Sequence, residues 1–176
     1  MGKTTLCKRL QEAHIGQNLI TCTTRPARSG EIDGQHYYFL SNEKFKQDLA
    51  DNKFIETAEV HGYFYGIRRQ YVEQELANNK TLILNIDVQG AATLRPLFPN
   101  NHIDFFIDTA SIETLHERLK NRSEDSPDVI KLRLAEAESE RIRKDEFQHV
   151  LINDDLDTCY KELENYITAY RKEQHV

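Results

Sequence analysis

From Arg69 onward the sequence alternates short apolar segments with longer amphipathic ones, and this alternation limits the possible folds more than any other feature. Short apolar runs are typical of buried strands, whereas apolar residues repeated every three or four positions are typical of helices. The predicted strands are 82–87, 103–108 and 149–152, and the predicted helices are 69–78, 91–98, 112–120 and 157–170. Such alternation predicts an α/β fold with a largely parallel sheet flanked by helices.

The first third of the chain is organised differently. A helix over 4–14 and a strand over 18–22 are followed by a loop over 23–35, which holds Pro26, Gly30 and Gly34. Strands over 37–40 and 54–60 then flank a helix over 42–50 that Ser41 caps, and the chain turns near Gly62 and Gly66. These short strands have hairpin character, which predicts an inserted substrate-binding subdomain over 20–68.

One further segment, 118–145, has the composition of an exposed and mobile element. Ser126 and Pro127 suit the cap and first turn of a helix that continues to Lys144. That helix is dense in charged residues and has a thin apolar stripe. We therefore predict one domain over 1–176, with a core of 1–19, 69–117 and 146–176, the subdomain 20–68 and a lid over 118–145.

Composition excludes several classes of protein. A formal net charge of -6 over 176 residues argues against nonspecific nucleic-acid binding, which requires a basic face. No apolar run approaches the roughly 20 residues that a membrane span needs, so we expect a cytoplasmic protein without a membrane partner. Three cysteines without C-x-x-C spacing indicate neither a disulfide framework nor a zinc site.

Gly2-Lys3-Thr4-Thr5, at the start of a predicted helix, forms the second half of the motif G-x-x-x-x-G-K-[ST]. In that motif backbone N–H groups and the lysine bind nucleotide phosphates, and the hydroxyl binds Mg²⁺. These residues are the candidate ATP-phosphate site, with Thr4 as the Mg²⁺ ligand, although an ordinary helix start is the alternative. Because the motif needs a strand and a glycine-rich turn, we expect about 10 residues to precede it.

The segment 21–37 places two arginines three residues apart in a loop bounded by glycines. Arg25 and Arg28 could bind one phosphate through paired charge-assisted hydrogen bonds, with the Tyr37 hydroxyl as a further donor. A solvated basic turn is the alternative. The order of residues, however, resembles the GMP-binding segment of guanylate kinases, T-T-R-x-x-R-x-G-E-x-x-G-x-x-Y. The resemblance assigns the GMP phosphate and its surroundings to Thr21, Arg25, Arg28, Glu31 and Tyr37.

The resemblance continues through 54–66, which is similar to the family pattern F-I-E-x-A-x-x-x-G-x-x-Y-G. It implies that Glu56 accepts hydrogen bonds from guanine and that Tyr65 contacts the phosphate. Adenine would leave the Glu56 carboxylate unsatisfied. Ile67 departs from the Ser or Thr that the family carries after this glycine, and base recognition loses a hydroxyl there.

Segment 82–90 is similar to the family pattern L-D-I-D-x-Q-G, which places Asp87 near the GMP base and ribose. Asn85 replaces the first acid of the pattern and lacks the charge to orient hydrated Mg²⁺ as strongly. Segment 150–155 is similar to V-I-V-N-D-D and places Asn153 near adenine. Arg118, Arg122 and Arg133 match the arginines of the family lid, which would close over the phosphates and stabilise the transferring group.

The resemblance runs from residue 2 to about residue 172. It implies a P-loop nucleoside monophosphate kinase that transfers a phosphoryl group from ATP to GMP or dGMP, with Mg²⁺ as cofactor and Lys3 among the catalytic residues. The expected assembly is a monomer or a homodimer. A non-catalytic protein-binding module is one alternative, and retention of Lys3 with the lid arginines speaks against it. A kinase for AMP, UMP or CMP is another, which Glu56 and Asp87 disfavour.

Overall fold

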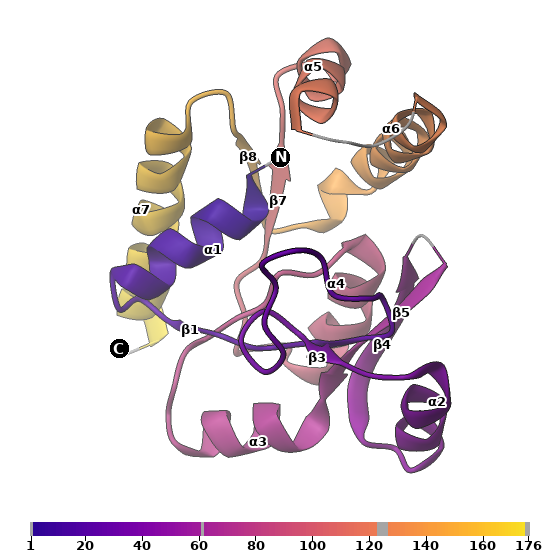
Figure 1. Ribbon diagram of the computed structural model, residues 1–176. Coiled ribbons are helices and arrows are strands. Elements are labelled where there is room, and N and C mark those ends of the chain that lie inside the picture. Colours follow the sequence, from indigo (N-terminus) through magenta and orange to yellow (C-terminus); the bar gives the residue numbers. More distant parts are fainter. Residues whose placement is uncertain (1, 61, 123–126, 175–176) are drawn as a thin grey trace. The chain divides into compact units, whose positions relative to one another are not determined.

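The computed structural model describes residues 2–60, 62–122 and 127–174, and these form two compact units (Figure 1). One unit contains residues 10–99, and the other contains residues 1–9 and 100–176. The boundary falls within the first helix, α1 (Lys3–Glu12). Its apolar face is buried through Leu6 and Leu10, the two residues whose spacing predicted the helix.

The unit over 10–99 contains two separate sheets. Its helices are the end of α1, α2 (Asn42–Ala50), α3 (Arg69–Ala77), α4 (Val88–Leu94) and the 3₁₀ turn η1 (Arg95–Leu97). Its strands are β1 (Gln17–Asn18), β2 (Cys22–Thr23), β3 (Tyr38–Phe39), β4 (Phe54–Val60), β5 (Tyr63–Arg68) and β6 (Leu82–Ile83).

The larger of these two sheets has the strand order β3-β2-β5-β4. β2 pairs parallel with β3 and antiparallel with β5, and β4 pairs antiparallel with β5 from Phe54↔Arg68 to Val60↔Tyr63. β1 and β6 form the second sheet as a parallel pair. The hairpin character predicted for the short strands over 20–68 is thus confirmed for β4 and β5, whereas β2 and β3 are parallel. β5 runs through Gly66, where we had expected a turn.

Aromatic side chains from three segments form the core of the four-stranded sheet. Phe45 of α2 stacks on Phe54 of β4 with ring centroids 4.6 Å apart, and on Phe64 of β5 at 5.5 Å. Cys22 of β2 is buried in the same cluster. Ile67, Val72 and Leu94 form a second cluster that joins β5, α3 and α4. Side chains on β5 therefore contribute to both cores.

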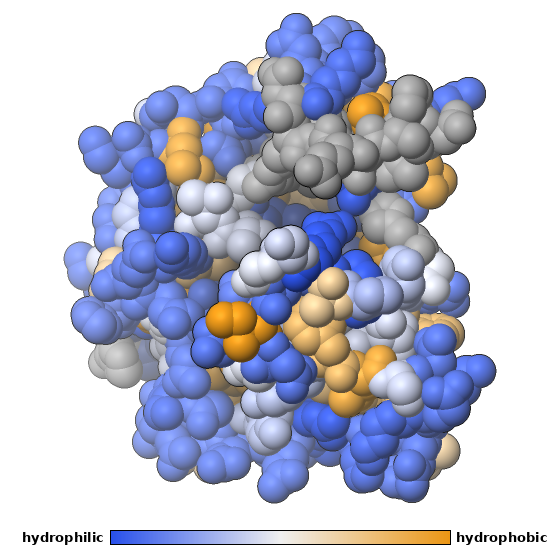
Figure 2. Space-filling model, in the orientation of Figure 1, coloured by the Kyte–Doolittle hydropathy of each residue, from blue (hydrophilic) through white to orange (hydrophobic). Residues whose placement is uncertain are grey.

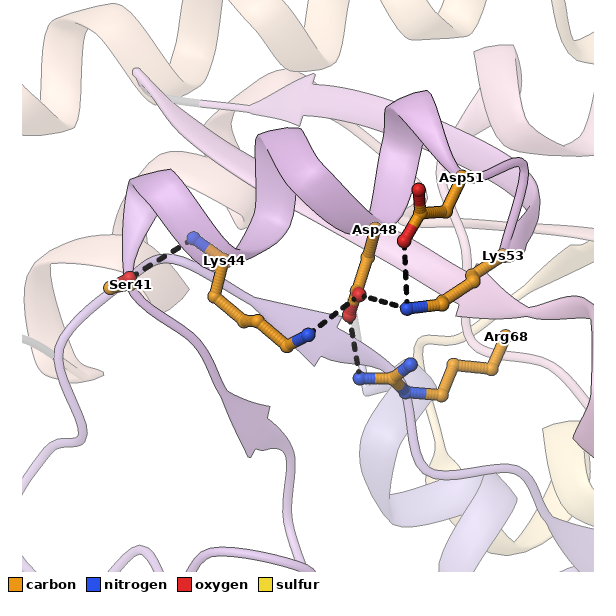
Figure 3. A network of polar contacts seen from close by, with 6 residues as sticks. All are labelled: Ser41, Lys44, Asp48, Asp51, Lys53 and Arg68. Carbon is orange, nitrogen blue, oxygen red and sulfur yellow. Dashed lines mark hydrogen bonds and ion pairs between the residues drawn. The ribbon is translucent and has the colours of Figure 1, made fainter.

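A buried carboxylate ties α2 to β5 (Figure 3). Asp48 is fully buried, and its oxygens accept hydrogen bonds from Lys44 and Lys53 at 2.9 Å and from Arg68 at 3.0 Å. Burial opposes ionisation of this group, but the hydrogen bonds from Lys53 and Lys44 and the charge of Arg68 lower its pKa to about 2. Asp48 therefore remains ionised while buried.

The unit over 1–9 and 100–176 is built around a further parallel pair, β7 (Phe105–Asp108) and β8 (His149–Ile152) (Figure 1). The connection between the two strands contains α5 (Ile112–Arg122), α6 (Pro127–Ile142) and the 3₁₀ turn η2 (Lys144–Glu146), and α7 (Leu156–Gln174) follows β8. Helices α5 and α6 share an apolar cluster around Leu115 and Ala137.

Most predicted elements are confirmed, and the α/β class with parallel strand pairs is correct. Ser41 accepts a hydrogen bond from the Lys44 N–H at 3.1 Å, as expected of a cap, whereas Ser126 lies outside the described residues. The single strand predicted over 18–22 is wrong, because the chain leaves β6 at Asn18 and joins β3 and β5 at Cys22. The strand predicted over 82–87 is likewise too long, since β1 offers a partner of two residues.

Charged and polar side chains dominate the face shown in Figure 2, and apolar atoms appear there in small separate groups. The most exposed large apolar residues that the structure describes are Ile142, Ile32 and Leu132. Ile142 and Leu132 lie on α6, which agrees with the predicted exposure of this helix. None of the described helices combines the length and apolarity required to cross a membrane.

Replacing Asp48 with Asn should lower the free energy of unfolding by about 1 to 2 kcal/mol at pH 7, after allowance for solvent around the two lysines. The folded-state pKa lies below the ordinary value of 3.8, so the stabilisation is present above that pH and disappears as the pH falls toward about 2. Urea unfolding from pH 7 downward measures the difference. Asp51→Asn is the matched control, because Asp51 is exposed and, among the residues that the structure describes, forms a salt bridge with Lys53 only. Equal losses in the two variants would contradict the role of Asp48.

Candidate functional site

The residues predicted to bind the acceptor phosphate lie together in the unit over 10–99. Arg25 donates to both oxygens of Glu31, at 2.8 and 2.9 Å. The backbone N–H of Arg28 donates to Glu31 at 2.7 Å, so one carboxylate fixes both ends of the turn. The Arg28 side chain is exposed. The loop therefore has a defined conformation even though it contains no regular structure.

Two tyrosines complete this cluster. The Arg25 guanidinium lies 5.5 Å from the centre of the Tyr37 ring, and the Tyr37 and Tyr65 rings are 6.0 Å apart in an edge-on arrangement. The Thr21 carbonyl accepts the Tyr38 N–H at 2.9 Å, which holds the start of the loop to β3. Thr21 thus precedes β2, Tyr37 precedes β3 and Tyr65 lies on β5.

The electrostatics of the cluster suit an anion. The hydrogen bond to Glu31 is the main cause of the raised Arg25 pKa, and the same bond lowers the pKa of Glu31. Burial raises the pKa of Tyr37, so its hydroxyl remains a donor. A guanidinium and two phenol groups are donors that bind phosphate oxygens well.

A second cluster, the pair of carboxyl groups of Glu56 and Asp87, lies between β4 and the start of α4. Glu56 is 5% exposed, and its Oε1 has no hydrogen-bond partner among the described residues. Asp87 caps α4 and accepts the Gly90 N–H at 2.7 Å. Burial, and secondarily the charge of Asp87, raise the pKa of Glu56 to about 7. A buried acceptor without a donor is costly to the free protein and is available to a ligand that brings N–H groups.

The departure at Ile67 has a structural explanation. Its side chain is 1% exposed and packs with Val72 and Leu94 in the second apolar cluster. The residue opposes Glu56 in the β4–β5 register. Where the family pattern has a hydroxyl, this chain has a core contact. Asn85, the second departure, is exposed and follows β6.

The candidate ATP-phosphate residues lie in the other unit. Gly2 has a φ of +79°, and the amide of Asn153 lies so close that a Cβ at Gly2 would overlap it. The Gly2 carbonyl accepts the Leu6 N–H at 3.0 Å, and α1 begins at Lys3. Thr4 and Thr5 are exposed in the first turn. The structure thus brings the predicted phosphate and adenine residues Gly2 and Asn153 into contact within one unit.

The three predicted lid arginines have different surroundings. Arg118 of α5 donates to the carbonyls of Asn153 at 2.6 Å and Asp154 at 2.9 Å, so it holds the loop that follows β8. Arg133 lies half-buried on α6. Arg122 ends α5, and its side chain lies outside the described residues. The structure therefore connects Arg118 with Asn153.

Two residues were missed as candidates from the sequence. Arg141 of α6 binds Asp108, at the end of β7, with Nε and Oδ2 3.0 Å apart. An arginine near a strand-terminal acid would have been a usable signal only if the approach of α6 to the end of β7 were known. Gly90 was part of a matched pattern but received no role, although it lies against both Glu56 and Asp87.

The donor set fits a magnesium ion that arrives with a nucleotide. The part of the chain that the structure describes contains no cluster of three or more acidic, histidine or cysteine residues able to hold a metal. Mg²⁺ commonly keeps several waters and binds substrate phosphates with few protein ligands. Such an ion can bind with a single hydroxyl as its protein ligand, and the predicted ligand is Thr4 in the first turn of α1.

The chain is similar to known proteins over nearly its whole length. The family profile described as guanylate kinase matches residues 1–170. Guanylate kinases of Hydrogenovibrio crunogenus and Dechloromonas aromatica are 42% and 43% identical to it, over 97% and 96% of this chain and 83% of each relative. The crystal structure of guanylate kinase from Anaplasma phagocytophilum aligns with a TM-score of 0.81 and 29% identity, over 95% of this chain and 81% of that one.

α1 begins at Lys3, directly after Gly2, and the α/β fold is that of the P-loop nucleotide-binding proteins, the class of the similar solved structure. Similarity over nearly the whole chain narrows this class to one family. The chain belongs to the guanylate kinase family.

Replacing Glu56 with Gln should stabilise the free protein, by about 1 to 3 kcal/mol above pH 7. The folded-state pKa of about 7 lies above the ordinary 4.5, so the folded protein binds the proton more tightly and loses stability as the pH rises from about 4.5 to 7. The gain in the variant should therefore vanish near pH 4.5. Urea unfolding at several pH values tests this. Glu59→Gln, on the exposed face of the same strand, should change little; a pH-independent effect at Glu56 would contradict the prediction.

Proposed function

We propose that the protein transfers the γ-phosphoryl group of ATP to the phosphate of GMP or dGMP, giving ADP and GDP. Membership of the guanylate kinase family supports this activity. The observation in this chain that carries it is the buried Glu56 carboxyl without a donor, on the same sheet as the Arg25–Tyr37–Tyr65 cluster. A ligand with N–H donors at one end and a phosphate at the other satisfies both.

The acceptor nucleotide is held by the unit over 10–99. Arg25, Arg28, Tyr37 and Tyr65 donate to its phosphate, while Glu31 keeps Arg25 oriented and Thr21 anchors the loop. Glu56 accepts from the guanine N1–H and 2-amino group, and Asp87 lies beside it. Adenine presents an acceptor where guanine presents N1–H, so it leaves the carboxylate unpaired and is disfavoured.

The donor nucleotide is held by the unit that contains the start of α1. The proposed contacts to the ATP phosphates come from the N–H groups and side chains of the first turn, namely Gly2, Lys3, Thr4 and Thr5. Asn153 lies near adenine. Thr4 would hold Mg²⁺, which would neutralise part of the phosphate charge when bound.

The reaction is an in-line displacement. An oxygen of the GMP phosphate forms a bond to the γ-phosphorus, and the bond between that phosphorus and the β–γ bridging oxygen breaks. Lys3, Arg118, Arg122 and Arg133 stabilise the charge that spreads over the transferring oxygens. The acceptor phosphate is already ionised at neutral pH, so no general base is needed.

Turnover of GMP with ATP, compared with turnover of AMP, tests the proposal directly. The expected result is GDP formation with a strong preference for GMP. Equal use of AMP and GMP would contradict the assignment of Glu56. Binding of GMP without turnover would favour a non-catalytic module instead.

Replacing Arg25 with Lys should raise the KM for GMP by roughly 10- to 100-fold, because lysine cannot reproduce the paired hydrogen bonds of the guanidinium. Steady-state kinetics with GMP varied at saturating ATP measures the effect. Arg143→Lys is the matched control, since Arg143 also makes two hydrogen bonds to one carboxylate, that of Glu146, outside the predicted site. A similar KM for both variants would remove Arg25 from the phosphate site.

A further inference from the structure

Gly90, in the first turn of α4, is where two acidic side chains meet the helix backbone. A Cβ at this position would lie 3.0 Å from Glu56 Oε1, 3.2 Å from Glu56 Cδ and 3.3 Å from Asp87 Oδ1. The residue is buried and lies within a regular helix, where its φ is not positive. Glycine in a helix is about 1 kcal/mol less favourable than alanine. The backbone therefore gives no reason for glycine here, and the space beside it does.

We propose that Gly90 is a specificity-determining residue of the base site, because its bare Cα leaves the space in which the Glu56 carboxyl lies beside Asp87. The inference rests on the proposed function and extends it to a residue that does not itself recognise the base. Its role is to position Glu56.

The position of the Glu56 carboxyl matters because no described residue donates a hydrogen bond to its Oε1. Oε1 of Glu56 is buried without a donor, whereas Oδ1 of Asp87 is satisfied by the N–H of Gly90 at 2.7 Å. An N–H group of guanine would thus complete Glu56. Hydrogen bonds weaken steeply with poor distance and angle, so a displaced carboxyl would read the base less well.

Among the described residues, no hydrogen-bond donor fixes Oε1 of Glu56 in place. Asp87 of α4 is the one charged group that raises the Glu56 pKa, in addition to burial. Arg69, at the start of α3, donates to the Phe54 carbonyl and lies 4.0 Å from Glu73. Arg68 of β5 is bound to Asp48. Both arginines are thus engaged elsewhere, so the contact that bears on the place of the Glu56 carboxyl is the one beside Gly90.

A methyl group at position 90 would act on Glu56 more than on the fold. The closest atoms to an added Cβ belong to the end of a flexible side chain, which can retreat by a few tenths of an ångström. Alanine also favours the helix. The Gly90→Ala variant is therefore expected to fold with Glu56 displaced from its place against α4.

The test compares Gly90→Ala with the unaltered protein in ATP-dependent phosphorylation of GMP and of IMP, which lacks the 2-amino group. The KM for GMP should rise about 10-fold with kcat nearly unchanged, and the preference for GMP over IMP should fall by a similar factor. The pH at which the GMP KM changes should also move downward, because a displaced carboxyl is more hydrated and farther from Asp87. Thr93→Ala, on the exposed face of the same helix, should leave all three quantities unchanged.

The outcomes separate the two proposals. Absence of GMP binding and turnover in the unaltered protein would overturn the proposed function and this inference together. Normal use of GMP with an unchanged KM, preference and pH dependence in Gly90→Ala would overturn the inference alone. If the variant does not fold, Glu56→Asp decides, because it withdraws the carboxyl by one methylene while Gly90 stays intact. A full GMP preference in Glu56→Asp would then refute the positional requirement.

Discussion

The buried carboxylate of Asp48 is the interaction on which the four-stranded sheet with the proposed acceptor site depends. It binds three cations that come from α2, from the segment after it and from β5. β5 is also the strand that pairs with both β2 and β4, and it carries Tyr65 and Ile67. A charge that is buried must be compensated, and here the compensation joins a helix to the central strand of a small sheet. The strand that carries Tyr65 and pairs with the strand of Glu56 is thereby attached to α2.

Glu56 is buried about as deeply as Asp48, and its surroundings are the opposite. Three cations hold Asp48 ionised, whereas Glu56 has an acidic neighbour and an oxygen without a donor. The Asp48 carboxylate contributes to stability, whereas the Glu56 carboxyl lowers it, in agreement with the binding function proposed for it. Differences of this kind between neighbouring acids are typical of functional sites. They also show that burial alone does not tell which acid serves the fold and which serves the ligand.

Much of the fold could be predicted because its signals are local. The cap at Ser41, the strand 149–152 and the alternation after Arg69 depend on neighbouring residues, and the structure confirms them. The errors concern pairing. Whether 18–22 forms one strand or two depends on where β6 and β3 lie, and those partners are far away in sequence.

The same distinction applies to the candidate site. The sequence pattern indicated Arg25, Glu31, Tyr37 and Tyr65, and the structure places these four together, while their roles stay predictions. Identifying Gly90 required knowing that side chains of β4 approach α4. Identifying the Asp108–Arg141 pair required knowing that α6 approaches β7. From the sequence, Ile67 meant only that base recognition loses one hydroxyl. In the structure the Ile67 side chain is buried in the apolar core, and the sequence pattern alone could not show this burial.

The ion pair between Arg25 and Glu31 has a consequence for how an anion binds. A free arginine side chain samples many rotamers, and fixing one on binding costs about 0.5 to 1.5 kcal/mol. Here Glu31 and the neighbouring Tyr37 ring already hold the guanidinium in one orientation. Most of that entropy is lost when the chain folds, so an incoming anion meets a preorganised donor. Part of the positive charge is already shared with Glu31, whose carboxylate competes with an incoming anion for the same donor group.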